Sequence, residues 1–170
     1  MKKFSFIVAL IFSAITLFAQ NPEITVEGDG TKVLKGFVSK QLIISDPAFA
    51  WFADNQKGYT PNAVALQALK GNKDAFRFLV FGGTWCGDTK FVLPKFYSLT
   101  DAAGVGQDRI TLLGVDRSKK TIQNLSEAFN VTNVPTIIVL KDGKEIGRVV
   151  EYGTSGMFDK DLGEIISRIK

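Results

Sequence analysis

The chain carries one group of residues that could support thiol chemistry. Its only cysteine, Cys86, lies in the run Trp85-Cys86-Gly87, shortly after an apolar segment that ends at Phe81. A helical pattern follows this run, so the sulfur is expected at the N-terminus of a helix. Unpaired backbone N–H groups and the positive end of the helix dipole stabilise a thiolate there. Because the thiolate is the nucleophilic form, the sequence predicts a reactive thiol at residue 86.

Two polar residues after Cys86 bear on this reactivity. Thr89 lies one helical turn further on, where its hydroxyl can donate a hydrogen bond to the sulfur but cannot form a disulfide with it. The carboxylate of Asp88 acts in the opposite sense, because a negative charge near the sulfur disfavours the thiolate. Asp88 also suits the first turn of a helix, where a carboxylate complements the dipole, so both interpretations of this residue stay open.

Other kinds of chemistry are excluded by residues that the chain lacks. With no histidine, it cannot use a Cys–His pair for proteolysis or acyl transfer, nor bind a metal through histidine. One cysteine cannot hold an iron–sulfur cluster. Gly82-Gly83 leads to Cys86 without the Lys-Ser/Thr ending of a phosphate-binding loop. We therefore expect no metal and no cofactor.

The composition is that of a single packed domain. Of the 170 residues 45% are hydrophobic, which is ample for a core and argues against disorder. The formal net charge is +4, but the basic residues are scattered along the chain and do not form a basic patch. Nucleic acid is therefore not an expected partner.

Residues 1–20 have the pattern of a secretory signal peptide. Lys2 and Lys3 precede an apolar run from Phe4 to Phe18, and cleavage is expected near Ala19 or Gln20. The alternative is an uncleaved anchor, since the run is nearly long enough to span a bilayer. The prediction is a periplasmic or secreted bacterial protein that does not associate with the membrane after cleavage. A single cysteine leaves no disulfide framework, so the fold must depend on its core.

The elements that must position Cys86 follow an alternating order from residue 76 onward. Apolar runs predict strands at 76–81, 110–115, 136–140 and 145–150, and helical patterns cover 88–103, 121–129 and 158–169. The first two strands should be parallel, and the last two should form a hairpin. This predicts an α/β fold with a mixed sheet of about four strands and helices on both faces.

The segment before residue 76 is less regular. Short strands are expected at 24–26 and 32–38 around a turn that could close a hairpin. Asp46-Pro47 and Thr60-Pro61 each look like a helix cap followed by proline in the first turn.

The order of these elements and two motifs resemble the thioredoxin superfamily. One motif is Trp85-Cys86-Gly87 after the first core strand, and the other is Val134-Pro135-Thr136 before the third. Three further features agree, namely Lys90, Pro94 and the turn Lys141-Asp142-Gly143-Lys144. The resemblance implies a three-layer thioredoxin-like domain at 74–170, with 21–73 as an N-terminal extension packed on the core.

The resemblance also implies roles for individual residues. Cys86 would be the nucleophile, assisted by Thr89, and Trp85, Gly87, Val134 and Pro135 would bind the substrate. In this family the proline is cis and faces the cysteine, which leaves the backbone before it free to pair with an extended client segment. Structural interpretations stay open as well: Cys86 as a small buried hydrophobe, Trp85 as a packing residue, and Pro135 as an ordinary trans proline.

Three departures from the family pattern limit what can be carried over. Thr89 replaces the resolving cysteine, Asp88 stands where proline is frequent, and Val80 replaces a buried carboxylate. We therefore expect Cys86 to form mixed disulfides with client proteins that carry cysteines or disulfides. An external thiol or a partner oxidoreductase would resolve them.

Two further possibilities follow from the same departures. The alternative function is a redox-inactive thioredoxin-fold module that binds a peptide or protein. The protein is expected to be a monomer or a weak dimer, and a third possibility is a dimer linked through Cys86.

Overall fold

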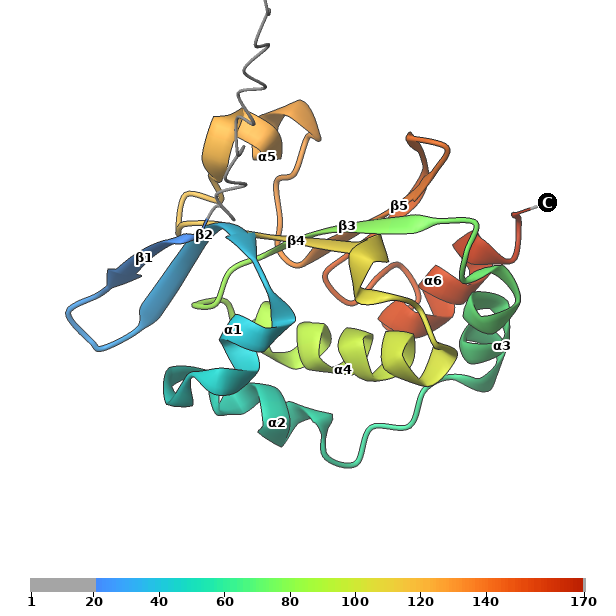
Figure 1. Ribbon diagram of the computed structural model, residues 1–170, viewed down its shortest axis with the longest axis horizontal. Helices are drawn as coiled ribbons and strands as arrows, with labels where there is room; N and C mark the ends of the chain where they lie inside the picture. Colours follow the sequence, from blue (N-terminus) through green and yellow to red (C-terminus); the bar gives the residue numbers. More distant parts are fainter. Residues whose placement is uncertain (1–20, 170) are drawn as a thin grey trace, which may run out of the picture.

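A mixed six-stranded sheet runs through the middle of the computed structural model, which describes residues 21–169 (Figure 1). The strands lie in the order β1-β2-β4-β3-β5-β6. Their bounds are β1 Glu23–Val26, β2 Lys32–Val38, β3 Arg77–Gly82, β4 Ile110–Gly114, β5 Thr136–Lys141 and β6 Lys144–Val150. The predicted signal peptide at 1–20 lies outside the described residues.

The prediction of about four strands is wrong, because the N-terminal hairpin joins the sheet. The hairpin itself is confirmed, since β1 pairs antiparallel with β2. β2 then adds to the edge of β4, with Gly36 opposite Gly114. A side chain at Gly114 would overlap the backbone of Leu34, so glycine at this position lets the two strands approach. The parallel pairing of β3 with β4 and the β5–β6 hairpin are as predicted.

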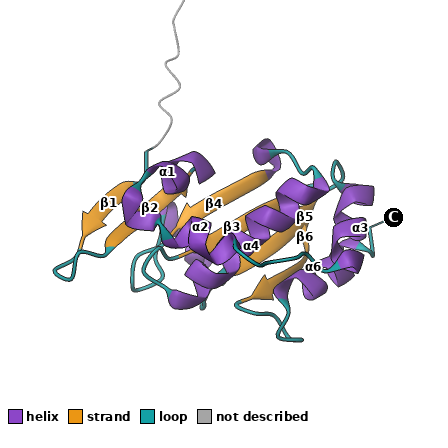
Figure 2. Ribbon diagram, turned by 90° about the horizontal axis from the view of Figure 1, so that it is seen from below, coloured by secondary structure: helices purple, strands orange, loops and turns teal. Residues whose placement is uncertain are grey.

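Helices cover the two faces of the sheet unequally. Their bounds are α1 Lys40–Ser45, α2 Trp51–Gln56, α3 Ala63–Asn72, α4 Gly87–Ala103, α5 Leu125–Ala128 and α6 Phe158–Ile166. All except α5 lie on one side of the sheet, and the short α5 lies alone on the other (Figures 1 and 2). Within residues 21–169 no helix is both long enough and apolar enough to cross a membrane.

Two sequence-based helix assignments need correction. The helix predicted at 121–129 is a 3₁₀ turn followed by the four-residue α5, because Gln123 and Asn124 adopt positive φ angles of 52° and 54° that interrupt an α-helix. The cap of α3 is Asn62 and not Thr60, since the Asn62 side chain accepts hydrogen bonds from the backbone N–H groups of Val64 and Ala65. Asp46 does cap the turn that begins at Pro47.

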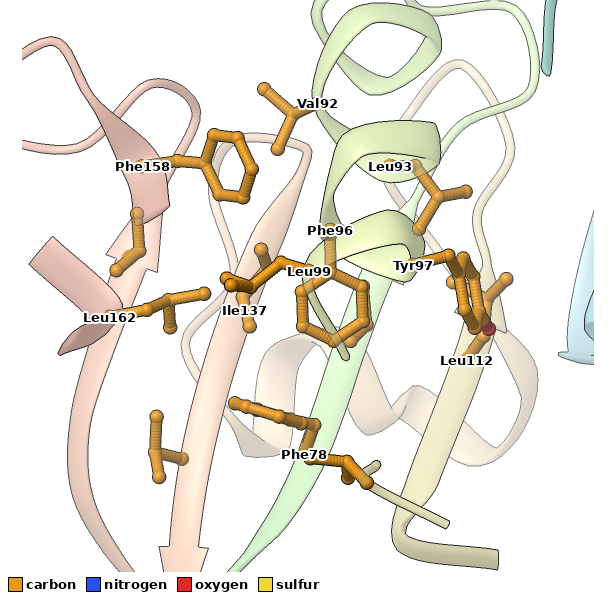
Figure 3. Packing of buried hydrophobic residues seen from close by; sticks show 14 of the residues in the cluster. Phe78, Val92, Leu93, Phe96, Tyr97, Leu99, Leu112, Ile137, Phe158 and Leu162 are labelled. Atoms are coloured by element: carbon orange, nitrogen blue, oxygen red, sulfur yellow. The ribbon is translucent and has the colours of Figure 1, made fainter. Parts of the chain in front are cut away.

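The larger core lies between the sheet and α4. Phe78 of β3 and Phe96 of α4 meet edge to face with ring centroids 5.0 Å apart, and both side chains are fully buried (Figure 3). Ile137 of β5 and Leu162 of α6 complete the contact from the neighbouring elements. Such burial of aromatic and branched side chains is the main stabilising contribution to a domain of this size.

A smaller core covers the opposite face. Its buried members are Leu79, Phe81, Leu113, Val115, Val131, Val134 and Ile138. The half-buried side chains of Trp85 and Cys86 pack against this smaller cluster. The predicted reactive residues therefore lie at the margin of the smaller core.

Candidate thiol site

Cys86 lies at the junction of β3 and α4, as the sequence predicted. It is the N-cap of α4, with an extended backbone, and its N–H donates to the carbonyl of Gly83 at 2.9 Å. The carbonyl of Cys86 accepts the first helical hydrogen bond, from Lys90 at 3.0 Å. The sulfur is thus held beside the unpaired N–H groups of the first helical turn.

The second predicted motif lies directly beside the sulfur. The Sγ atom of Cys86 is 3.3 Å from the carbonyl oxygen of Val134, and the Val134–Pro135 peptide bond is cis. Antiparallel pairing of β5 with β3 brings these two residues together, although they are 48 positions apart in the sequence. Within residues 21–169 the N–H of Val134 makes no hydrogen bond.

Thr89 contacts the turn and not the sulfur. Its hydroxyl oxygen accepts a hydrogen bond from the N–H of Gly83 at 3.2 Å, and its side chain is buried. Its methyl group packs close to Gly82, where an added Cβ would lie 3.0 Å away. The expected hydrogen bond from Thr89 to Cys86 is absent among the described residues. The Thr89 hydroxyl therefore stabilises the backbone of the turn at Gly83.

Asp88 is hydrogen-bonded to Tyr152, a residue that the sequence analysis did not predict to be part of the site. The phenol of Tyr152, in the loop after β6, donates a hydrogen bond to Asp88 Oδ1 at 2.8 Å. This bond, then partial burial and the charge of Asp88, raise the pKa of Tyr152, with a smaller contribution from Cys86. The Tyr152 ring also lies 5.5 Å from that of Phe91 on α4. No local pattern marks Tyr152, because its partner is 64 positions away.

Trp85 is held by the loop after β4 and by the turn that precedes Cys86. Its indole Nε1–H donates to the carbonyl of Val115 at 3.0 Å. The ring lies so close to Gly83 that a Cβ there would come within 2.7 Å of it, so glycine is required at this position. The neighbouring Thr84 donates to the carbonyl of Lys32 at 2.8 Å and accepts from the N–H of Leu34 at 3.2 Å. The N-terminal hairpin therefore supports the cysteine turn directly.

The remaining predicted site residue is Gly87, the first residue of α4, which is exposed beside the sulfur. Within residues 21–169 no three metal-binding side chains come together.

These features define a thioredoxin fold with one cysteine at its characteristic turn. The family model for thioredoxin matches residues 67–163, and the chain belongs to the thioredoxin family. It is 36% identical to a thioredoxin of Echinococcus granulosus over 92 residues, which are 53% of this chain and 77% of that protein. It is 37% identical to a thioredoxin of Chlamydia muridarum over 89 residues, 52% of this chain and 76% of that one.

A solved structure agrees at the level of the fold. The crystal structure of an HIV epitope-scaffold matches with a TM-score of 0.56 and 17% identity, covering 79% of this chain and 94% of the scaffold. The family relation supports a thioredoxin-like redox function and, in general, client proteins that carry thiols. The match begins at residue 67, so the β1–β2 hairpin lies outside it.

Proposed function

We propose that the protein acts in thiol–disulfide exchange through Cys86 alone and forms mixed disulfides that an external thiol resolves. The observation that carries this proposal is the position of the sulfur, which is half-buried at a helix N-terminus and 3.3 Å from the carbonyl of Val134. A cysteine that served only as a packing residue would not need the unpaired N–H of Val134 beside it.

The reaction begins when the Cys86 thiolate attacks one sulfur of a client disulfide. A bond between Cys86 and the client forms as the client's own S–S bond breaks, and the departing sulfur takes up a proton from water. A thiolate from outside the protein, or a second thiol of the client, then attacks the client sulfur. Cys86 leaves as a thiolate and a new disulfide forms on the client, so the protein loses no electrons over the cycle.

Trp85, Gly87, Val134 and Pro135 are proposed to bind the client. An extended client segment would accept a hydrogen bond from the N–H of Val134 and lie across the cis proline. Thr89 contributes through the shape of the turn, because its hydroxyl holds the N–H of Gly83.

We further propose that the protein is exported to the periplasm or secreted, and that it works as a monomer or weak dimer. The support for export is the sequence pattern of residues 1–20. Outside the cytosol, thiols and disulfides of other proteins are available as clients, together with partner oxidoreductases that could resolve the mixed disulfide.

The test is to react the purified protein with glutathione disulfide and with a disulfide-linked cysteine peptide, and to measure adducts by mass spectrometry. We expect one adduct per chain, released by added thiol and absent in Cys86→Ser. Insulin reduction should be poor with thioredoxin reductase as the sole electron source, because no second thiol resolves the intermediate. Efficient turnover under that condition would contradict the proposal.

A second result would favour the redox-inactive binding module. If the native protein forms no adduct and Cys86→Ser retains the same client peptides, binding and not thiol exchange explains the site. A disulfide-linked dimer on non-reducing electrophoresis would instead identify Cys86 as a crosslink between two copies.

A further inference from the structure

The N-terminal hairpin carries a carboxylate that reaches the rim of the thiol site. Glu27 lies in the turn after β1, and Arg117 lies in the loop after β4, 90 positions later. Arg117 Nε donates to both Glu27 oxygens, at 2.7 and 2.9 Å, and Nη2 donates to Oε2 at 2.5 Å. This two-point geometry orients the guanidinium plane as a single hydrogen bond would not.

The oriented guanidinium stands over the tryptophan next to the cysteine. The Arg117 Cζ atom is 5.4 Å from the centroid of the Trp85 ring, within the range of a cation–π contact. Trp85 is also held at its Nε1 by Val115, two residues before Arg117. The loop after β4 therefore contacts the ring at two points, and Glu27 determines the position of one of them.

Other contacts bind the same hairpin to the same loops. Lys35 of β2 forms an ion pair with Asp116 at 2.8 Å, and Thr84 is hydrogen-bonded to the backbone of β2 on both sides of Val33. The hairpin thus bridges the loop after β4 and the turn that contains Cys86. Glu27 is the one member of this set whose partner touches Trp85.

We propose that Glu27 is a positioning residue for the thiol site: through Arg117 it holds Trp85 beside Cys86 and so promotes the approach of a client chain to the sulfur. The inference rests on the proposed function of Cys86. It assigns a role to the hairpin, which lies outside the segment that matches thioredoxin.

The variant Glu27→Gln tests the inference, because it removes the charge at nearly constant size. The reaction of Cys86 with a disulfide-linked cysteine peptide should slow by about two- to fivefold, the factor that corresponds to an exposed cation–π contact. Alkylation of Cys86 by iodoacetamide should not slow, because this small reagent does not need the Trp85 ring to orient it. Arg117→Ala should slow the peptide reaction to a similar degree.

Tryptophan fluorescence reports directly on the exposure of the Trp85 ring. The chain has two tryptophans, so in a Trp51→Phe background the emission comes from Trp85 alone. In that background Glu27→Gln should increase quenching of Trp85 by acrylamide. A general loss of stability would not move this signal under conditions where the chain remains folded.

A matched control is available at the other end of the sheet. Arg148 and Glu145 form a similar two-point pair, with both distances 2.6 Å, near the β5–β6 turn. Arg148 is less exposed than Arg117 and also donates to the carbonyl of Phe129 at 2.9 Å. Glu145→Gln removes the same kind of carboxylate–guanidinium contact, and it should alter neither the peptide reaction nor the quenching of Trp85.

The outcomes separate the inference from the function on which it rests. If the parent protein reacts with the peptide and Glu27→Gln reacts equally fast, the inference is overturned and the proposed function stands. A change in quenching without a change in rate overturns it as well. If the parent protein never forms the adduct, the proposed function has failed, and the inference fails with it.

Discussion

The two faces of the sheet carry cores of different size and different content. On one face α4 buries a continuous aromatic cluster around Phe78 and Phe96, sealed by α6. On the other face a smaller cluster, aliphatic except for Phe81, lies under the short α5 and borders Trp85 and Cys86. The larger cluster joins the sheet to α4 and α6. The smaller cluster is in contact with Cys86. The candidate thiol thus borders the smaller of the two clusters.

Strand β5 shows this division between adjacent residues. Ile137 and Ile138 are both fully buried, but Ile137 belongs to the large cluster and Ile138 to the small one. Successive side chains of a strand point to opposite faces, so one strand supplies both cores. The pair allows the same substitution to be compared on the two faces.

The largest effect is expected from truncating the centre of the large core. Phe96→Ala removes a ring that contacts both Phe78 and Tyr97 and should lower the free energy of unfolding by about 3–5 kcal/mol. The change in the free energy of unfolding is measured by urea denaturation monitored by circular dichroism. In the folded fraction, Cys86 should be alkylated at the parental rate. A selective loss of thiol reactivity without destabilisation would contradict the division between the faces.

An intermediate effect sharpens the comparison along β5. Ile137→Val and Ile138→Val should each cost about 0.5–1.5 kcal/mol, since each deletes one buried methyl group. Only Ile138→Val is expected to change the rate of the Cys86–peptide reaction, because only its cluster borders the thiol. Denaturation curves give the two costs and the adduct assay gives the two rates. Equal rates in both variants would show that the small core does not influence the site.

The smallest effect concerns the link between Tyr152 and Asp88. Tyr152→Phe removes one exposed hydrogen bond and should cost about 0.5 kcal/mol, the lower end of the usual range. The hydrogen bond to Asp88 raises the pKa of Tyr152, so its stabilising contribution is complete below the unfolded tyrosine pKa of about 10. It is then lost as the pH rises through the higher pKa of the folded state.

The corresponding measurement compares unfolding of Tyr152→Phe and of the parent protein between neutral and alkaline pH. The difference between them should be present near neutrality and should vanish at alkaline pH. A difference that stays constant across the range would mean that the phenol–carboxylate bond is not its source.

Much of the site could be predicted from local sequence. An apolar strand followed by Trp85-Cys86-Gly87 and a helical pattern placed the sulfur at a helix N-terminus, because each of these signals depends on neighbouring residues only. The cis bond at Val134-Pro135, which the structure contains, was implied by the resemblance to thioredoxins and not by the local sequence. The helix at 121–129 was wrong, since the positive φ angles of Gln123 and Asn124 leave no clear mark in residue types that tolerate several conformations.

The sequence by itself determined the family, the position of the lone thiol and the absence of a second cysteine or any histidine. Only the tertiary structure decided which side chains surround that thiol. Tyr152 reaches Asp88 across 64 positions, Thr84 reaches Lys32 across 52, and Arg117 reaches Glu27 across 90. The partners in such contacts are set by strand order and loop packing, so no window of neighbouring residues contains the information that pairs them.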